Sequence, residues 1–342
     1  MPTVNALLTN FNSGNYHGRL HYLTPEDTPF ATMLGGFAPG GGQVATARTF
    51  EWQTTDLRAG SATAQVPDAA DAPSPQNRAR ESVFNVIETH TDTVGVGFER
   101  MAQHGQFNVP GSPSSDAQNI DQGSNPITSE LPWQVTQMWK QIKRDIEQSL
   151  INGTYNLPTA NNANARTRGI RQAIVTNEVD ATISTAAGSD PLNFLNVEQA
   201  MQLAWDNGGL QEGESRVLMV PSIHKRQLSW DYHHRGLAPR SRTVFGVNVE
   251  TVETSFGVLN VVLNRHIPNG NALVLDFSHL VPWFRMIPPH DGVPGGVSFS
   301  YTKARDGNRT EQVLYTSIGL EYGNEKAHAK ITNLSTAQPT DD

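Results

Sequence analysis

The sequence predicts an α+β protein with a long two-stranded arm, and three observations support this fold class. Apolar and polar residues alternate in two stretches between positions 45 and 98, which is typical of half-buried strands. An amphipathic pattern at positions 129–152 predicts one long helix. Short helix and strand patterns then follow one another from 166 to 286, and strand patterns return after 287. We therefore expect a mixed fold from which the arm extends.

Composition excludes several classes of function. The 342 residues include no cysteine, so disulfides, thiolate metal sites and cysteine nucleophiles are excluded. The net charge is −8, with six lysines and nineteen arginines and no basic run, which argues against sequence-specific or tight nucleic-acid binding. The N-terminus lacks the pattern of a secretory signal and no apolar run could span a membrane, so we expect a soluble cytoplasmic product with no membrane partner.

Charged residues are scarce, and this indicates extensive protein interfaces. They form 17% of the chain, below the ~25% of ordinary globular domains. The cores of protein interfaces are depleted of charge, whereas Asn, Thr, Ser, Gln and Gly are abundant here. We therefore expect much of the surface to contact other copies of the chain.

The first two segments are expected to have no compact core of their own. Residues 1–44 show little periodicity and end in a glycine-rich stretch, which predicts an N-terminal arm. In residues 45–98, Phe50 and Trp52 alternate with polar residues, and Phe84, Val86, Val94, Val96 and Phe98 share one parity, so we expect the two strands of one ribbon. About twenty residues rich in Ala, Pro, Asp and Ser separate the strands, which is long for a loop inside a domain. Because an isolated two-stranded ribbon is marginal in water, we expect it to lie on a partner surface.

The next segment, residues 99–165, contains the long helix after a loop near 105–125. Ser129 is a candidate cap, the apolar stripe runs from Leu131 to Leu150, and Asn152 with Gly153 can end the helix. Lys143 and Glu147 are spaced as an i,i+4 ion pair.

The rest of the chain is expected to form a compact α+β unit, residues 166–286, followed by a C-terminal return, residues 287–342. In the first part, Asn196 is expected to cap a helix, Ser222 to begin another, and a strand pair to turn at 255–257. In the second part, a hairpin about Asp306 and Gly307 precedes a third strand or tail.

Six short motifs occur in order along the chain and resemble those of one group of phage capsid proteins. They are Asp27 to Phe30 (DTPF), Glu51 to Leu57 (EWQTTDL), Lys143 to Glu147 (KRDIE), Arg166 to Ile170 (RTRGI), Ser255 to Gly257 (SFG), and Asn264, Arg265 and Pro268. The chain thus resembles the major capsid proteins of tailed bacteriophages, which have the fold first described in bacteriophage Hong Kong 97. The resemblance covers nearly the whole length.

This resemblance implies an assembly function. The segments above would be the N-terminal arm, the extended loop with the first peripheral strand, the peripheral domain with its spine helix, the axial domain, and the C-terminal return to the peripheral domain. Pentamers and hexamers would form an icosahedral shell around the genome, a virion capsid assembled in the host bacterial cytoplasm. A separate scaffold protein, a cementing protein and a portal are possible partners. Residues 45–98 contain no lysine, so the lysine–asparagine isopeptide bond of some relatives is not expected here.

The candidate site residues are those of a subunit interface, all in or beside the expected ribbon. They are Phe50, Trp52, Arg58, Arg78, Arg80 and Phe84. The aromatic residues offer apolar contact area, and the arginines can form intersubunit ion pairs or remain solvated.

No catalytic residue, cofactor site or metal site is predicted, so we do not expect an enzyme. Asp231, His233, His234 and Asp276 are possible metal ligands by residue type, but they show no metal-binding spacing. Two other functions remain open: a bacterial nanocompartment shell of the same fold, and a β-rich phage-associated hydrolase or sugar-binding protein, which would need a cleft with paired carboxylates.

Overall fold

The computed structural model describes most of the chain and divides it into two units. The described residues are 23–24, 26–36, 41–57, 59–68, 71, 74, 77–102, 130–160, 163–181, 190–211, 215–235, 240–244, 247–303 and 307–337. The larger unit comprises Asp27–Thr91, Ile142–Phe299 and Tyr315–Asp342, and the smaller unit Met1–Glu26, Asp92–Gln141 and Ser300–Leu314. The expected loop at 105–125 and the expected cap Ser129 lie outside the described residues.

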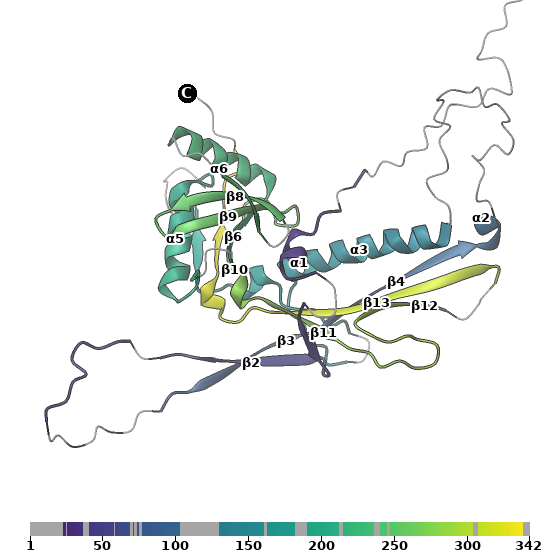
Figure 1. Ribbon diagram of the computed structural model, residues 1–342, viewed down its shortest axis with the longest axis horizontal. Helices are drawn as coiled ribbons and strands as arrows, with labels where there is room; N and C mark the ends of the chain where they lie inside the picture. The colour runs from purple at the N-terminus through teal and green to yellow at the C-terminus, as the bar shows by residue number, and fades with distance from the viewer. Residues whose placement is uncertain are drawn as a thin grey trace, which may run out of the picture. The chain divides into compact units, whose positions relative to one another are not determined.

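A seven-stranded mixed sheet forms the centre of the larger unit (Figure 1). Its order is β5-β14-β10-β6-β9-β8-β7. The bounds are β5 (Glu178–Asp180), β6 (Arg216–Val220), β7 (Arg240–Val244), β8 (Val247–Thr254), β9 (Gly257–Leu263), β10 (Ala272–Asp276) and β14 (Ala329–Thr332). Nearly all residues of strands β6 and β10 are buried. The strand pair β8 and β9 turns at 255–257, which confirms the expected hairpin.

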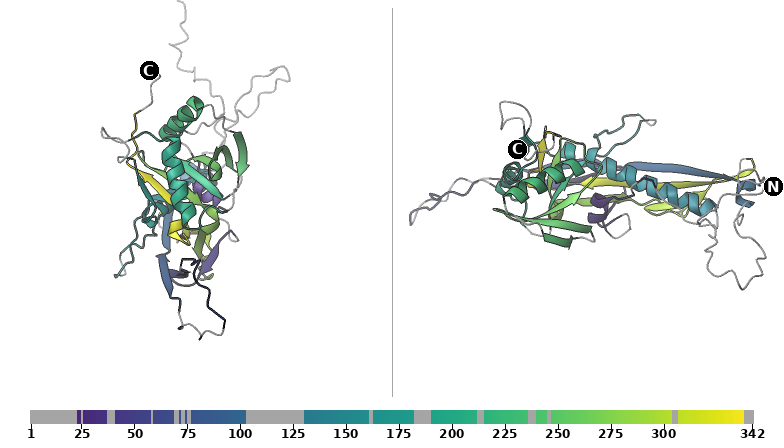
Figure 2. Two further views of the ribbon diagram at one scale, coloured as in Figure 1. Left: turned by 90° about the vertical axis from the view of Figure 1, so that its left-hand side faces the viewer. Right: turned by 90° about the horizontal axis from the view of Figure 1, so that it is seen from above.

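Two helices lie against this sheet, α5 (Phe194–Asp206) and α6 (Ser222–His234), as Figures 1 and 2 show. Val197, Ala200, Met201 and Ala204 of α5 pack into the core with residues of β6, β9, β10 and β14. Helix α6 begins at Ser222 as predicted. The prediction for α5 was wrong at its cap: Asn193 is the cap, and its side chain accepts the N–H of Asn196, which lies in the first turn.

A second sheet has the order β1-β11-β13-β12, and β4 also pairs with β13. The bounds are β1 (Gln43–Ala45), β4 (Glu88–Gly97), β11 (Val281–Arg285), β12 (Ser298–Thr302) and β13 (Arg309–Glu321). Of these, β4, β12 and β13 continue from one unit into the other, as does helix α3 (Glu130–Asn152). In the smaller unit, α2 (Phe98–Ala102) follows β4, and Arg100 pairs with Glu130 of α3 at 2.7 Å. The C-terminal strand β14 does not add to this second sheet; it lies in the seven-stranded sheet between β5 and β10.

Helix α3 confirms the expected long helix, and its end is as predicted. In the larger unit, Ile142, Ile146 and Leu150 are buried, and the Gly153 N–H closes the last turn on the Ser149 carbonyl. The short elements α1 (Pro29–Met33), α4 (Ile170–Ala173), η2 (Phe277–His279) and η3 (Glu325–Ala327) complete the described fold.

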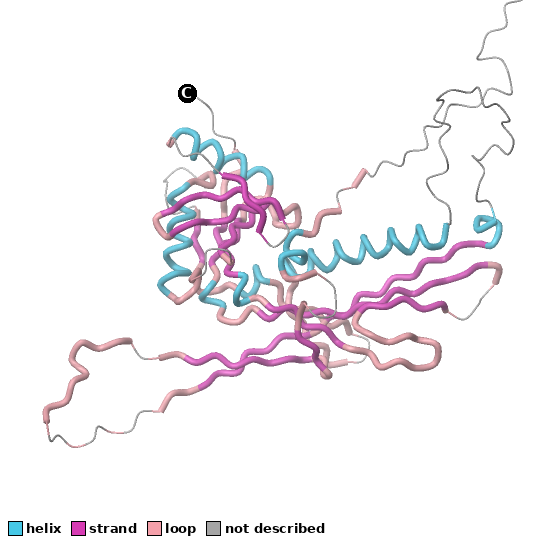
Figure 3. Tube along the Cα trace, in the orientation of Figure 1, coloured by secondary structure: helices cyan, strands magenta, loops and turns pink. Residues whose placement is uncertain are grey.

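Strands β2 (Thr49–Thr55) and β3 (Arg80–Val86) form the ribbon. They pair antiparallel from Thr49 opposite Val86 to Thr55 opposite Arg80, and beyond that point they give way to loop (Figure 3). The expectation that the second ribbon strand continues to Phe98 was wrong. Strand β3 ends at Val86, and the N–H of Ile87 donates to the Arg48 carbonyl. The next strand, β4, pairs with β13 instead of β2.

Candidate assembly surface

The ribbon is fastened to the rest of the larger unit by aromatic side chains near its start. Phe50 is only 4% exposed, and its ring stacks on Trp283 with centroids 4.9 Å apart. Trp52 meets Tyr322 edge to face at 4.9 Å, and its indole N–H donates to the Gly323 carbonyl at 2.8 Å. Such contacts fix the ring positions as well as burying apolar area. Phe50 and Trp52 therefore hold the ribbon to its own chain.

A buried asparagine fastens the other strand of the ribbon. Asn85 is fully buried, and its amide N–H₂ donates to the carbonyls of Leu320 at 2.7 Å and Arg168 at 3.2 Å. Its amide oxygen accepts the N–H groups of Val86 and Arg168, both at 2.8 Å. One side chain thus joins β3 to β13 and to the loop segment at Arg168. We call Phe50, Trp52 and Asn85 the ribbon root.

Arg168 extends this attachment. Its guanidinium donates to the Tyr322 hydroxyl at 2.9 Å and lies 4.8 Å from the centroid of the Tyr155 ring. Burial raises the pKa of Tyr322, while the Arg168 charge opposes that shift. Tyr322 therefore remains a neutral phenol at physiological pH and can accept this hydrogen bond.

Beyond the root, the ribbon is exposed, and its side-chain hydrogen bonds join its own two strands. Arg80 donates to Gln53 at 3.3 Å, and Ser82 donates to Glu51 at 3.1 Å. Phe84 is 43% exposed although it is a large aromatic residue, and its ring has an edge contact with Tyr155 at 5.9 Å. Phe84 lies opposite Glu51, at the level of the root, and Arg80 lies opposite Thr55 further out. The exposed ribbon surface therefore offers an aromatic side chain and neutral or charged polar groups to a partner.

An open cleft of about 1290 Å³ lies between the ribbon and the rest of the larger unit. One wall is formed by ribbon residues 52–55, and the other by residues near the end of α5 and around η3, including Asp206 and residues 321–326. Its lining contains five acidic residues and three lysine or arginine residues. They are Asp56, Glu81, Asp206, Glu321 and Glu325, against Arg78, Arg168 and Lys326. The cleft thus favours a neutral or basic occupant.

The structure separates the sequence-predicted interface residues into groups. Phe50 and Trp52 belong to the ribbon root. Phe84 and Arg80 lie exposed on β3, Arg78 is exposed and lines the cleft, and Arg58 lies outside the described residues. Contact of these six residues with a second subunit stays a prediction. Sequence reasoning did not single out Asn85 as a site residue, because a lone asparagine in a strand carries no local signal.

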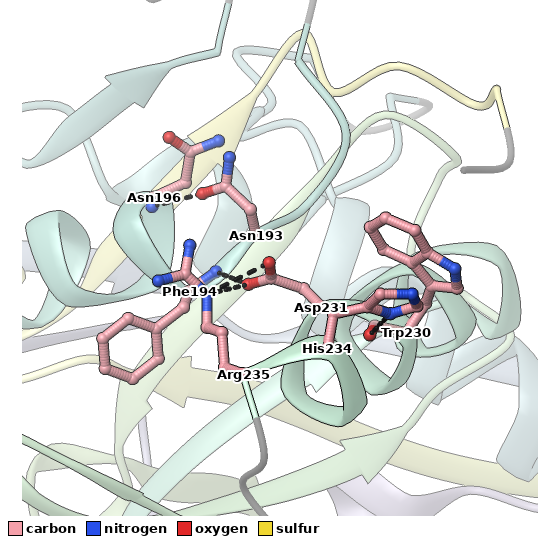
Figure 4. A network of polar contacts seen from close by, with 7 residues as sticks. All are labelled: Asn193, Phe194, Asn196, Trp230, Asp231, His234 and Arg235. Carbon is pink, nitrogen blue, oxygen red and sulfur yellow. Dashed lines mark hydrogen bonds and ion pairs between the residues drawn. The ribbon is translucent and has the colours of Figure 1, made fainter. Parts of the chain in front are cut away.

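The possible metal ligands near the end of α6 have other partners. The Asp231 carboxylate accepts the Phe194 N–H at 2.8 Å and pairs with Arg235 at 3.1 Å, as Figure 4 shows. His234 is bonded through Nδ1 to the Trp230 carbonyl at 2.8 Å (Figure 4). Across the described ranges, no three His, Asp or Glu side chains are grouped so that they could hold a metal ion. Asp231 instead connects α6 to the start of α5.

Solved structures with this fold define its class. The capsid of cyanophage A-1(L) matches with a TM-score of 0.60 at 11% identity, covering 97% of this chain and 99% of its own. The capsid of cyanophage P-SCSP1u matches with a TM-score of 0.54 at 11% identity, covering 96% and 98%. An encapsulin complex from Synechococcus elongatus PCC 7942 matches with a TM-score of 0.56 at 13% identity, covering 100% and 99%. The chain therefore has the Hong Kong 97-like capsid fold, which these capsid and encapsulin chains share.

The family follows from the sequence. The family model described as SU10 major capsid protein matches residues 3–335, so the chain belongs to this family of structural capsid proteins. No curated protein matches the chain. Within the described residues, no helix has the length and apolar character needed to cross a bilayer.

Proposed function

We propose that this major capsid protein assembles as pentamers and hexamers into an icosahedral shell that encloses a phage genome. The observation that carries the proposal is the match to the capsid family over residues 3–335, together with a ribbon that is fastened at its root while Arg78, Arg80 and Phe84 are exposed. Closed symmetry lets many modest contacts form at once, so no single contact has to be tight.

The outer ribbon is the part that would lie on a neighbouring copy. Phe84 would supply apolar contact area, and Arg78 and Arg80 would supply charge. The cleft beside the ribbon would receive a neutral or basic part of the neighbour, since its lining has an acidic excess. No lysine occurs in residues 45–98, so this contact is noncovalent.

Each segment of the chain is assigned one structural role in the capsid subunit. These are the N-terminal arm (1–44), the extended loop and first peripheral strand (45–98), the peripheral domain with spine helix (99–165), the axial domain (166–286) and the C-terminal return (287–342). Assembly takes place in the host bacterial cytoplasm, with a separate scaffold, a cementing protein and a portal as candidate partners. The chain carries out no chemical reaction in this role.

The test is electron microscopy of the purified full-length protein. We expect closed shells or rings of five and six subunits. Deleting residues 62–76, at the far end of the ribbon, should leave the protomer folded by circular dichroism but impair shell formation. Phe84→Ser should also reduce the yield of shells, while Phe84→Leu, which keeps the apolar contact, serves as the matched control.

Several results would contradict the proposal. Normal shells from the 62–76 deletion would show that the ribbon is not needed between subunits. A stable monomer with hydrolytic activity would support the hydrolase alternative. Because an encapsulin shares the fold, particles purified from the native source should also be analysed for content: packaged DNA supports the capsid, and enclosed cargo protein supports the nanocompartment.

A further inference from the structure

A buried carboxylate attaches α1, which lies within the N-terminal arm, to the rest of the larger unit. Glu147 of α3 is fully buried. Its Oε2 accepts the Ala31 N–H at 2.7 Å, and its Oε1 accepts the Phe30 N–H at 2.9 Å and the Asn264 side-chain amide at 2.7 Å. Phe30 and Ala31 belong to α1, and Asn264 directly follows β9. The carboxylate therefore joins α1, α3 and the end of β9.

This carboxylate supplies acceptors that α1 lacks. N–H groups in the first turn of a helix have no acceptor within that helix. Phe30 and Ala31 are the second and third residues of α1, and Glu147, from a different helix, accepts both of their N–H groups. Because the groups bonded to Glu147 are all donors, the position requires a side chain with two acceptor oxygens.

Apolar packing supports the same attachment. Phe30 is fully buried, and its ring lies edge to face with Phe277 at 5.6 Å between centroids. Ala31, Met33 and Leu34 are buried as well, and α1 also contacts β8. Part of the expected N-terminal arm therefore lies within the packed interior of the larger unit.

Motifs that lie far apart in the sequence meet at this junction. On its outer side, Asp27 pairs with Arg265 at 3.0 Å, but both side chains are largely exposed, and exposed ion pairs contribute little. Sequence spacing predicted an ion pair between Lys143 and Glu147, whereas the carboxylate points into the core instead. The three motifs that meet here are those at 27–30, 143–147 and 264–268.

We propose that Glu147 is the positioning residue of the N-terminal arm: its carboxylate fixes the point at which the arm leaves the larger unit, so that the arm is ready to contact other subunits. The assembly part of this inference rests on the proposed function, whereas the attachment of α1 does not. Ordering a chain segment costs conformational entropy for every residue that is fixed. With α1 already held, residues 28–34 need not be ordered when subunits associate, and preorganisation of this kind strengthens association.

Glu147→Gln tests the attachment. Glutamine keeps the size of the side chain but turns an N–H₂ group toward one of the donors, so at least one N–H of α1 loses its acceptor. A hydrogen bond to a charged group corresponds to about 10- to 100-fold in an equilibrium constant. In mildly alkaline solution, where the carboxyl group is ionised, the amides of residues 28–36 should therefore exchange about 10- to 100-fold faster in Glu147→Gln than in the unaltered full-length protein.

Asn264→Ala is the matched control. It removes the third donor at the same carboxylate but leaves both bonds to α1 in place, so exchange over residues 28–36 should rise much less than in Glu147→Gln. Equal exchange in these two variants would show that the bonds to Phe30 and Ala31 do not hold α1, and would overturn the proposal.

Shell yield by electron microscopy tests the role in assembly. Glu147→Gln should keep the circular dichroism spectrum of the folded protein and yield fewer closed shells than Asn264→Ala. An unaltered yield of shells from a variant whose α1 has opened would overturn the positioning role. A failure of the unaltered protein to assemble would instead contradict the proposed function, and exchange at residues 28–36 would still decide the attachment.

A measurement on the unaltered protein covers the case in which Glu147→Gln does not fold. Single-residue hydrogen exchange should find the amides of Phe30 and Ala31 as slow as those of Thr32 and Leu34, which donate to main-chain carbonyls. Fast exchange at Phe30 and Ala31, as in a first turn without acceptors, would overturn the proposal.

Discussion

Replacing Asn85 with alanine would remove the polar attachment of the ribbon root. The asparagine amide makes four hydrogen bonds, to Leu320, to Val86 and, in both directions, to Arg168. Alanine can replace none of them. Because the site is fully buried, water cannot take over these bonds without opening the root.

The magnitude follows from the number of bonds. A neutral hydrogen bond contributes a net ~1 kcal/mol, so four suggest a loss of about 4 kcal/mol. At 1.4 kcal/mol for each factor of ten, this corresponds to a rise of roughly 10²- to 10³-fold in the opening equilibrium of the root. The loss is a large share of the 5–15 kcal/mol stability typical of proteins. We therefore expect Asn85→Ala to release the ribbon before it unfolds the rest of the larger unit.

Hydrogen exchange of peptides covering residues 80–88 and 166–170 measures this opening directly, and electron microscopy of the same preparation measures shell yield. Ser82→Ala is the matched control on the same strand, because Ser82 is exposed and its hydroxyl bonds the exposed Glu51, so it should change stability by no more than ~0.5 kcal/mol. If the amides of these peptides exchanged at the same rate in Asn85→Ala as in Ser82→Ala, the aromatic contacts alone would hold the root, and the role given to Asn85 would be wrong.

Two further predictions concern the larger unit. In Gly319→Ala, the added Cβ would lie 2.6 Å from Cε1 of Phe50, so the ring must move. Thermal or urea unfolding should show a loss of about 1–3 kcal/mol in the free energy of unfolding. Gly95→Ala is the control, because its Cβ would meet ordinary contacts at 3.6 Å or more. Burial lowers the pKa of His328 to about 4, and its Nδ1 accepts the Asp276 N–H at 3.2 Å, a bond that protonation breaks. Since the unfolded chain binds this proton first, neutral His328 stabilises the fold by about 3 kcal/mol near pH 6.5, and this contribution is lost as the pH falls to 4. The difference in urea midpoint between the unaltered protein and His328→Gln should therefore shrink from pH 6.5 to pH 4. An unchanged difference would contradict the prediction.

The ribbon shows how far local patterns determine structure. Alternation of Phe50 and Trp52 with polar residues predicted β2, and the long Ala-, Pro- and Ser-rich segment predicted the loop between the two ribbon strands. The same parity continues through Phe84, Val86 and Val94, so it could not reveal the break at Ile87. Which strand β4 joins depends on β13, more than two hundred residues away, and periodicity holds no information about that choice.

Polar side chains were harder to place than apolar ones, for a related reason. Asn193 and Asn196 are equally good caps by residue type, and only the backbone geometry selects Asn193. Helical spacing paired Glu147 with Lys143, but spacing cannot show that the N–H groups of Phe30 and Ala31, more than a hundred residues earlier, donate to the Glu147 carboxylate. The capsid fold itself was predictable, because six motifs in order carry more information than any single residue.

Glu147 and His328 change the pH dependence of stability in opposite directions, because burial raises the pKa of Glu147 from 4.5 to about 7 and lowers the pKa of His328 to about 4. Between pH 4.5 and 6.5 the native state gains a proton at Glu147, and the unfolded state gains one at His328. The first makes the free energy of unfolding fall as the pH rises, and the second makes it rise, each by about 3 kcal/mol over its range. The two contributions oppose each other in a global unfolding curve, and His224 and His266, whose pKa burial also lowers, act in the same direction as His328. Removing the titration at His328 should therefore make the pH dependence of the urea midpoint less positive: from pH 5 to pH 7 the midpoint of His328→Gln should rise less, or fall more, than that of the unaltered protein. An identical pH dependence in the two proteins would show that His328 does not titrate as its burial requires.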